Sequence, residues 1–372
     1  MISPKRLYQA VADFNPDSDL SLALLLLCLK LVTYQGSADE INSLYHISRR
    51  LLNAIEEAGM ISLHLLQSTI LVAVYESGNG VFPGAYLTIG RAARLAALLG
   101  LNDRRMTQLL KPADTWTLRE EERRTWWAIF VLERHINLCP KGLPLVTPQP
   151  AWGTLLPITD SRWNDGEIGS SEALFTSGFS SAANVGPYAR LCQASHLLGL
   201  VLTHRNEGIG KSGDRSINFS EALQLEKTLT ALDGHLVQQL NASSVSWAFA
   251  VDLAISCSAQ MTLWNMYACN EPDAVQDSHE RLAMETELQT LSIEGLKRLP
   301  VERAMRIAQD VRHLDEAGIR RVSPLIVECL YHAATECKWF VRENYDVGMV
   351  VALESLTQAL RYMGKHWKLA GL

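Results

Sequence analysis

The sequence predicts an all-α fold, and three observations lead to that prediction. Apolar residues recur at steps of three and four along the whole chain, the spacing of one helix face. No stretch shows the sustained alternation that is typical of a half-buried strand. Gly59, Gly100 and Gly318 lie just past the apolar stripes or between them, where helices commonly end. We therefore expect an irregular helical bundle or superhelix of about a dozen or more helices.

The candidate helices follow one another along the chain. The leucine-rich run at 20–32 is too short to span a bilayer, so we expect a core helix there. The run at 247–268 is long enough to span a bilayer, but Asp252, Ser256 and Gln260 lie on one side of it. This polar side also favours a core helix. Further apolar stripes predict helices near 39–57, 62–76, 84–100, 118–138, 187–205, 219–240, 281–297 and 301–316.

Two more helices are expected near the C-terminus. Ser323 followed by Pro324 is a helix-start pattern, because serine caps the first turn and proline fits within it. The buried faces that follow are Ile326, Leu330, Ala333, Cys337 and Val341, and then Leu353, Leu356, Leu360, Met363 and Trp367.

One region breaks the helical pattern. Residues 140–187 are dense in proline, glycine and serine, and so long a connection is uncommon unless it is functional or partly disordered. We therefore predict an N-terminal helical half at 1–139, a connection at 140–187, and a C-terminal half of the same domain at 188–372. A second flexible loop is expected at 208–214.

Charge argues against nucleic-acid binding by this chain alone. It has 34 lysines and arginines against 40 aspartates and glutamates, a net charge of −6. A compact nucleic-acid binder usually carries a basic stripe, whereas the arginine pairs at 104–105, 123–124 and 320–321 are isolated. We therefore expect weak DNA binding, if any.

The seven cysteines predict neither a disulfide framework nor a zinc finger. Their number is odd, and no pair has CxxC spacing. Most have apolar neighbours, where a reduced cysteine acts as a small core residue. We therefore expect a reducing compartment, the cytosol or the nucleus. The cysteines are Cys28, Cys139, Cys192, Cys257, Cys269, Cys329 and Cys337.

Nucleotide-binding and catalytic motifs are not matched. Gly210-Lys211-Ser212 lacks the earlier glycine of a phosphate-binding loop, since that position is Arg205. Gly78-Asn79-Gly80 lacks the third glycine of the dinucleotide fingerprint and follows a predicted helix. The sequence contains no GxSxG, HExxH or SxxK motif. We therefore predict no catalytic or cofactor-binding residues.

The histidines do not form a recognisable metal site. His332 and Glu336 lie one helical turn apart, but such a pair is more often a surface contact than a ligand set. His196 and His204 lie two turns apart, and we expect no nearby acidic partner for them. We therefore predict no metal-binding residues in this chain.

The segment 84–144 carries the most information. The EEERRTWWAIFVLER run at 120–134 is apolar nearly all round the helix, which predicts a helix surrounded by others. Arg123, Trp127 and Arg134 fall on one stripe of it. An arginine held there needs a carboxylate or carbonyl partner, or an aromatic face to stack on.

These residues carry a family resemblance. The GRAARLAALLGL helix, the EEERRTWWAIFVLER helix and the following Gly-Leu-Pro resemble the middle homology region of fungal zinc-cluster transcription factors. The segments SPLIVECLYHAA and MGKHWKLAGL are similar to that family's closing helices, so the resemblance covers residues 20–372. The family-signature positions, mostly structural in expectation, are Gly84, Gly90, Arg91, Arg94, Arg123, Arg124, Trp126, Trp127, Arg134, Gly142 and Pro144.

The resemblance implies a non-enzymatic, effector- or partner-responsive regulatory domain in a fungal nucleus. Implied partners are the transcription machinery or another regulator, a small-molecule effector, or a second copy of the chain, but no membrane. Family members carry an N-terminal six-cysteine zinc cluster that binds DNA, and we expect this chain to lack it, through truncation or true loss. Zinc is then expected only in that cluster and DNA contact only through it. A stand-alone small-molecule-binding protein or enzyme, and a scaffold for another regulator, remain alternatives.

Overall fold

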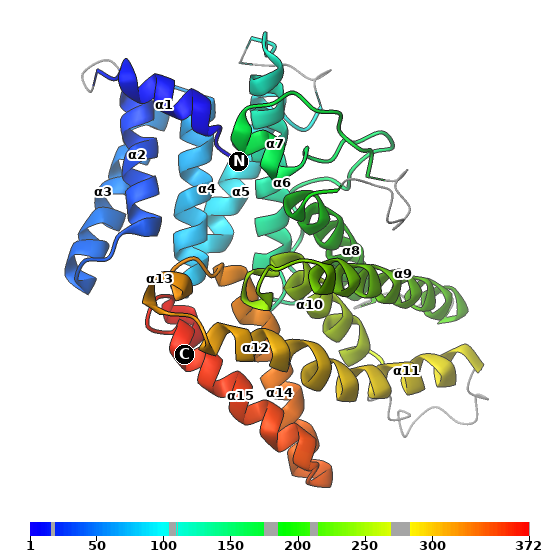
Figure 1. Ribbon diagram of the computed structural model, residues 1–372. Coiled ribbons are helices and arrows are strands. Elements are labelled where there is room, and N and C mark those ends of the chain that lie inside the picture. Colours follow the sequence, from blue (N-terminus) through cyan, green and yellow to red (C-terminus); the bar gives the residue numbers. More distant parts are fainter. Residues whose placement is uncertain are drawn as a thin grey trace. The chain divides into compact units, whose positions relative to one another are not determined.

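The computed structural model describes residues 1–15, 19–103, 109, 111–174, 185–208, 215–268 and 283–371, which are mostly helical (Figure 1). Within these ranges no sheet occurs, and a single β-bridge joins Leu155 to Ala173. The predicted all-α fold class is confirmed. The chain divides into two compact units: unit 1 holds 1–136 and 144–192, and unit 2 holds 137–143 and 193–372. Gly210-Lys211-Ser212 lies outside the described residues.

Unit 1 is built from helices that are capped as their sequences predict. Ser37 and Glu40 form a capping box at the start of α3, and the Ser62 hydroxyl accepts from the Leu65 N–H at the start of α4. Along the chain α2 packs on α4, α4 on α5, and α5 on α6 (Figure 1). The helices are α1 (Pro4–Ala12), α2 (Leu20–Thr33), α3 (Ala38–Glu57), α4 (Leu63–Gly78), α5 (Gly84–Leu98), α6 (Trp116–Ile136) and α7 (Asp160–Asp165).

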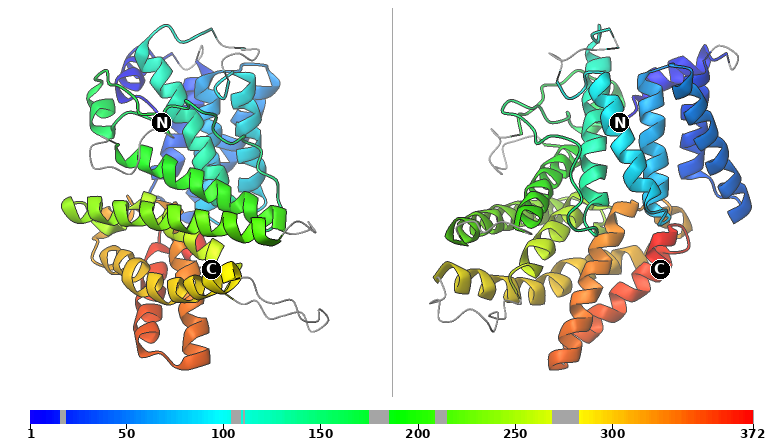
Figure 2. Two further views of the ribbon diagram at one scale, coloured as in Figure 1. Left: turned by 90° about the vertical axis from the view of Figure 1, so that its right-hand side faces the viewer. Right: turned by 180° about the vertical axis from the view of Figure 1, so that it is seen from behind.

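Unit 2 surrounds a helix that is buried along nearly its whole length. Every residue of α10 from Asp252 to Trp264 is buried, and α9, α11 and α14 pack against it. Helices α14 and α15 form an antiparallel pair (Figure 2). The helices are α8 (Pro187–Gly208), which begins in unit 1, α9 (Arg215–Ala242), α10 (Val251–Asn265), α11 (Ala283–Leu299), α12 (Met305–Arg312), α13 (Glu316–Ile319), α14 (Val327–Asn344) and α15 (Val347–Met363).

Several elements differ from the sequence prediction, among them the short helices α7 and α13, which were not expected. Helix α1 was not predicted, and none of its residues is buried. The helix predicted at 301–316 is wrong in its bounds. A π-helical turn at Pro300–Ala304 joins α11 to α12, and α12 ends at Arg312. Pro300 has no N–H to donate to the preceding turn, which favours such a local change of hydrogen-bond register.

The two longest apolar runs are core helices, as predicted. Residues 20–32 lie within α2, and residues 247–268 contain α10. None of the described helices is long and apolar enough to cross a membrane. The thiols of six cysteines are free, five of them buried and that of Cys139 exposed, while Cys269 lies outside the described residues.

Alanine substitutions at two glycines are expected to have opposite effects on the stability of unit 2. A Cβ at the buried Gly295 of α11 would lie 2.6 Å from the Trp264 ring, whereas one at the exposed Gly234 of α9 would meet nothing within 4 Å. Gly295→Ala should therefore destabilise unit 2 by about 1–3 kcal/mol through overpacking. Gly234→Ala should stabilise it by about 0.5–1 kcal/mol through helix propensity. Urea unfolding of both variants checks this, and a stabilised Gly295→Ala would contradict the packing of α11 on α10.

Candidate functional site

Helix α6 is the centre of the candidate site in unit 1. Trp127 is fully buried, and Phe130 packs edge-on against it with ring centroids 5.1 Å apart. Trp126 is only half-buried, so the helix is not enclosed on all sides as its composition had predicted. The 100° between adjacent side chains explains the difference, because one neighbour faces the core and the other faces a groove.

The stripe formed by Arg123, Trp127 and Arg134 faces the 144–174 segment. All three side chains donate hydrogen bonds to it, so the proline- and glycine-rich segment is fastened along α6 by polar contacts from one helix face. The bonds run from Arg123 Nη1 to Ser171 Oγ at 2.7 Å, from Trp127 Nε1 to the Leu155 carbonyl at 3.0 Å, and from Arg134 Nη2 to the Thr147 carbonyl at 3.1 Å.

Arg134 is fully buried, and its guanidinium contacts a carboxylate, a backbone carbonyl and an aromatic ring. Its guanidinium pairs with the Glu133 carboxylate at 2.5 Å and lies 3.6 Å above the centroid of the Phe130 ring. The same carboxylate accepts from the Thr147 N–H at 3.1 Å and from the Val146 N–H. Burial lowers the pKa of Arg134 to about 10, and the Glu133 charge opposes that shift. Arg134 therefore satisfies a buried acid and does not face a groove.

Arg124 is the second buried arginine of α6. It bonds to Glu120 at 3.2 Å, to Asp160 at the start of α7 at 3.0 Å, and to the Ile158 carbonyl at 2.6 Å. Its guanidinium also lies 4.9 Å from the Trp163 ring centroid. In return, the Tyr188 hydroxyl donates to the Arg124 carbonyl at 2.8 Å. Arg124 thus joins α6, α7 and the first turn of α8 within unit 1.

The signature positions on α5 have separate roles. Arg91 bonds to Glu56 at 2.5 Å and to Asn53 at 2.8 Å, which ties α5 to α3. Arg94 is exposed. Gly84 begins α5, and a Cβ there would lie 3.2 Å from Val81, whereas one at Gly90 would have no atom closer than 4.0 Å. A side chain would therefore be tightly packed at the first of these two positions and only in ordinary contact at the second.

Gly142 and Pro144 lie beyond the end of α6. Gly142 has a φ of +77°, a conformation that favours glycine, and its N–H donates to Asn206 of α8 at 3.2 Å. Pro144 is exposed. The eleven signature positions are therefore not one binding site, since the structure brings together only the α6 group with its partners on 144–174.

A groove of about 750 Å³, the unit 1 groove, lies beside this network. Trp126 and Arg123 of α6 line one side, and the 148–155 segment lines the other with Trp152, whose side chain is 84% exposed. Arg119 and Glu122 add charges of both signs. The groove can therefore accommodate a ligand or peptide with aromatic and polar groups.

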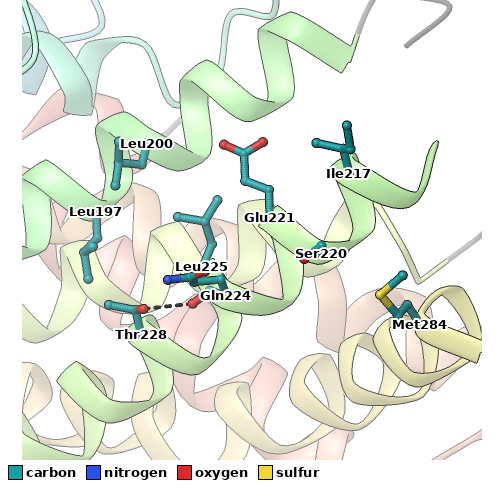
Figure 3. A pocket seen from close by; sticks show the side chains of 9 residues that line it. All are labelled: Leu197, Leu200, Ile217, Ser220, Glu221, Gln224, Leu225, Thr228 and Met284. Atoms are coloured by element: carbon teal, nitrogen blue, oxygen red, sulfur yellow. Dashed lines mark hydrogen bonds between the residues drawn. The ribbon is translucent and has the colours of Figure 1, made fainter. Parts of the chain in front are cut away.

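Unit 2 has an apolar groove of about 670 Å³ between α8 and α9 (Figure 3). At its edge Glu221 lies 3.1 Å from Nδ1 of His204, whose Nε2 lies 2.5 Å from the Tyr267 hydroxyl. The expectation that His204 has no acidic partner is therefore wrong, because Glu221 of the next helix faces it. The groove is lined by Leu197, Leu200, Ile217, Ser220, Glu221, Gln224, Leu225, Thr228 and Met284.

The partners of the arginines were missed by sequence reasoning. Thr147, Asp160 and Tyr188 have no motif around them, and only their proximity to α6 shows their roles. The structure gives His332 and Glu336 different partners. Glu336 accepts from Asn265 at 2.9 Å, and His332 faces Glu328.

Comparison with known proteins identifies the family. The profile of the fungal specific transcription factor domain matches residues 18–227, a segment that includes all eleven signature positions. The chain belongs to this family of fungal transcription regulators. Its role is therefore regulatory and lies in transcription, as the sequence predicted. No solved structure matches the chain.

Three curated relatives are named as transcription regulators. The chain is 35% identical to Transcription factor BOA15 of Botryotinia fuckeliana (strain B05.10), over 33% of this chain and 70% of that protein. It is 28% identical to the azaphilone cluster-specific transcription factor azaR of Aspergillus niger, over 44% of this chain and 37% of that protein. It is 31% identical to the pigment biosynthesis transcriptional activator pigB of Monascus ruber, over 35% of this chain and 25% of that protein. The chain thus spans well under half of the last two relatives.

Proposed function

We propose that this chain is the effector- or partner-responsive regulatory domain of a nuclear fungal transcription factor. The family match over 18–227 carries the proposal. Two of the relatives are named for azaphilone and pigment biosynthesis, which supports a role in controlling a biosynthetic gene cluster. The domain acts by binding other regulators or the transcription machinery rather than by catalysis. DNA contact is made by a zinc cluster outside residues 1–372 or by a partner protein.

The unit 1 groove is the proposed site of that response. A molecule bound there touches α6 through Trp126 and the 148–155 segment through Trp152. Trp127 joins these two elements through its hydrogen bond to the Leu155 carbonyl, and Arg123 bonds to Ser171, further along the chain from the same segment. A ligand that binds one arrangement of the segment on α6 more tightly than another shifts the population toward the arrangement it prefers. The free energy of that shift cannot exceed the difference between the ligand's binding free energies for the two arrangements.

Tethering provides the test. Residues 1–372 are fused to a heterologous DNA-binding domain in a fungal host, and transcription of a reporter is compared with that from the DNA-binding domain alone. We expect a severalfold change, in either direction, together with nuclear accumulation of the fluorescently tagged chain. Trp152→Ala should reduce the response without changing the melting temperature, because Trp152 is exposed. Tyr331→Ala, an exposed aromatic on α14, is the matched control.

A chain that leaves the reporter unchanged would contradict the regulatory proposal. The unit 2 groove favours the alternative of a small-molecule-binding protein, because it is mainly apolar and has the His204–Glu221 pair at its edge. In that case Leu200→Arg, and not Trp152→Ala, should abolish binding of an apolar fluorescent probe.

A further inference from the structure

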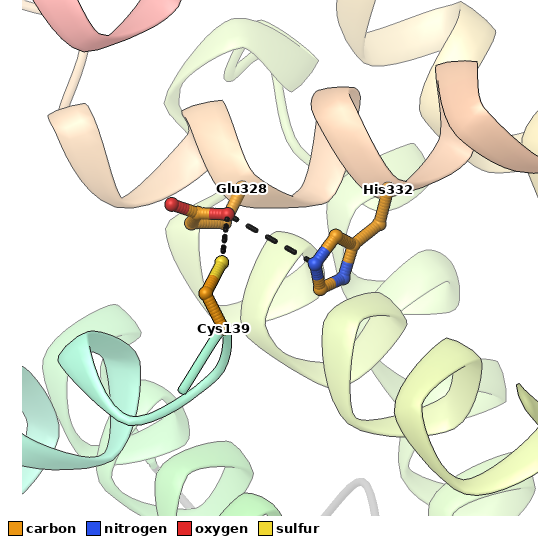
Figure 4. Close-up of side chains that lie close together, drawn as sticks. All are labelled: Cys139, Glu328 and His332. Carbon is orange, nitrogen blue, oxygen red and sulfur yellow. Dashed lines mark hydrogen bonds and ion pairs between the residues drawn. The ribbon is translucent and has the colours of Figure 1, made fainter. Parts of the chain in front are cut away.

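Three side chains with metal-binding atoms meet in unit 2, outside both grooves (Figure 4). They are Cys139, in the segment just after α6, and Glu328 and His332 on α14. The Cys139 Sγ lies 3.1 Å from Oε2 of Glu328, and the same oxygen lies 4.0 Å from Nε2 of His332. All three atoms lie within 4.8 Å of one another, and no other such group occurs among the described residues.

The backbone around Cys139 is held in place by α8. The Arg205 guanidinium donates to the carbonyls of Asn137 at 3.0 Å, Leu138 at 2.7 Å and Pro140 at 2.9 Å. These bonds fix the carbonyls on both sides of Cys139, while its thiol points to α14 (Figure 4). Glu328 and His332 are four residues apart, so they share one face of the helix. Cys139 is therefore held by the hydrogen bonds of Arg205 to its loop, and Glu328 and His332 are held by the α14 helix.

The ligand types suit a thiophilic divalent cation. The Cys139 thiol donates a hydrogen bond to the Glu328 carboxylate, so a cation that binds must displace the thiol proton. Thiolate sulfur and imidazole nitrogen are ligands that Zn²⁺ prefers, whereas Mg²⁺ and Ca²⁺ prefer oxygen ligands.

The distances are near those that zinc requires. Bond lengths of about 2.3 Å to sulfur and about 2.0–2.2 Å to nitrogen and oxygen put tetrahedral ligand atoms about 3.2–3.7 Å apart. The 3.1 Å between the thiol and the carboxylate is just under that range, and the imidazole, 4.0 Å from the carboxylate and within 4.8 Å of the thiol, must approach by roughly 1 Å. The Arg205 charge lies nearby and opposes a cation, but a thiolate and a carboxylate supply two negative charges against it.

We propose that Cys139, Glu328 and His332 form a Zn²⁺ site, with water as the fourth ligand. Binding releases one proton as the thiol becomes a thiolate bound to the metal. The site is separate from the DNA-binding zinc cluster of the family. It fastens the segment that follows α6 to α14, which are far apart in the sequence.

Metal titration of the full chain, without a histidine tag, tests the proposal. After chelation the protein is titrated with Zn²⁺ against a chromophoric indicator, and with Co²⁺ to detect the thiolate-to-cobalt charge-transfer band. The wild type should bind one Zn²⁺ at this site and show that band. Cys139→Ser and His332→Gln should each bind at least about tenfold more weakly, and Cys139→Ser should lose the band.

The exposed His313→Gln variant is the matched control and should bind as the wild type does. Circular dichroism melting of each variant shows that it is folded, which we expect because Cys139 is exposed. Failure of the wild type to take up zinc overturns the proposal. So does equal zinc affinity of the wild type and both ligand variants, which would locate the metal elsewhere.

Discussion

Replacing Trp127 by alanine is expected to destabilise the protein by about 3–5 kcal/mol. The side chain is fully buried, packs edge-on against Phe130, and donates to the Leu155 carbonyl. Alanine leaves a cavity in the centre of unit 1 and leaves that carbonyl without its indole partner. The loss is a large share of a typical domain stability of about 5–15 kcal/mol, so the melting temperature should fall sharply or the protein become insoluble.

Two neighbouring tryptophans provide the controls. Trp152→Ala, at a side chain that is 84% exposed, should change stability by no more than about 0.5 kcal/mol. Trp126→Ala, at a half-buried position, should fall between the two. Urea unfolding of the three variants gives the order. A folded Trp127→Ala protein with an unchanged midpoint would show that α6 is peripheral to unit 1.

The sequence could predict α6 and its partner types, but not the partners themselves. The apolar residues around the 120–134 run require a mostly buried helix, and a buried arginine requires a carboxylate, a carbonyl or an aromatic face. Arg134 has all three, in Glu133, Thr147 and Phe130. Adjacent residues on a helix diverge by about 100°, so the pairing with Glu133 was not expected. Thr147 belongs to a loop, whose path no periodicity describes.

The proposed zinc ligands were even less predictable from the sequence than the partners of Arg134. Cys139 and Glu328 are 189 positions apart, and neither has the local spacing by which metal sites are found in sequences. Their proximity follows from the tertiary structure of unit 2, in which Arg205 of α8 holds the loop that carries Cys139. The all-α class depends on local patterns and was predictable, whereas such a site depends on long-range packing.

Replacing Arg134 by methionine is expected to cost about 3–5 kcal/mol, although the volume is nearly conserved. The change removes the cation that neutralises Glu133, whose exposed fraction is 1%, and a buried charge without its counter-ion is unfavourable. Arg298→Met, which breaks a surface pair with Glu302 at 4.0 Å, should change stability by less than about 1 kcal/mol. Thermal and urea unfolding compare the two.

A double-mutant cycle separates the lost charge pair from lost packing. Gln at position 133 keeps one carbonyl oxygen for the N–H groups of Val146 and Thr147 but carries no charge. Glu133→Gln combined with Arg134→Met should therefore be more stable than Arg134→Met alone, with a coupling of about 0.5–3 kcal/mol. Strictly additive effects would mean that Arg134 stabilises the fold through its contact with Phe130 and the Thr147 carbonyl, and not as the counter-ion of Glu133. A folded Arg134→Met protein with unchanged stability but no reporter response would assign Arg134 to an effector site, against its complete burial here.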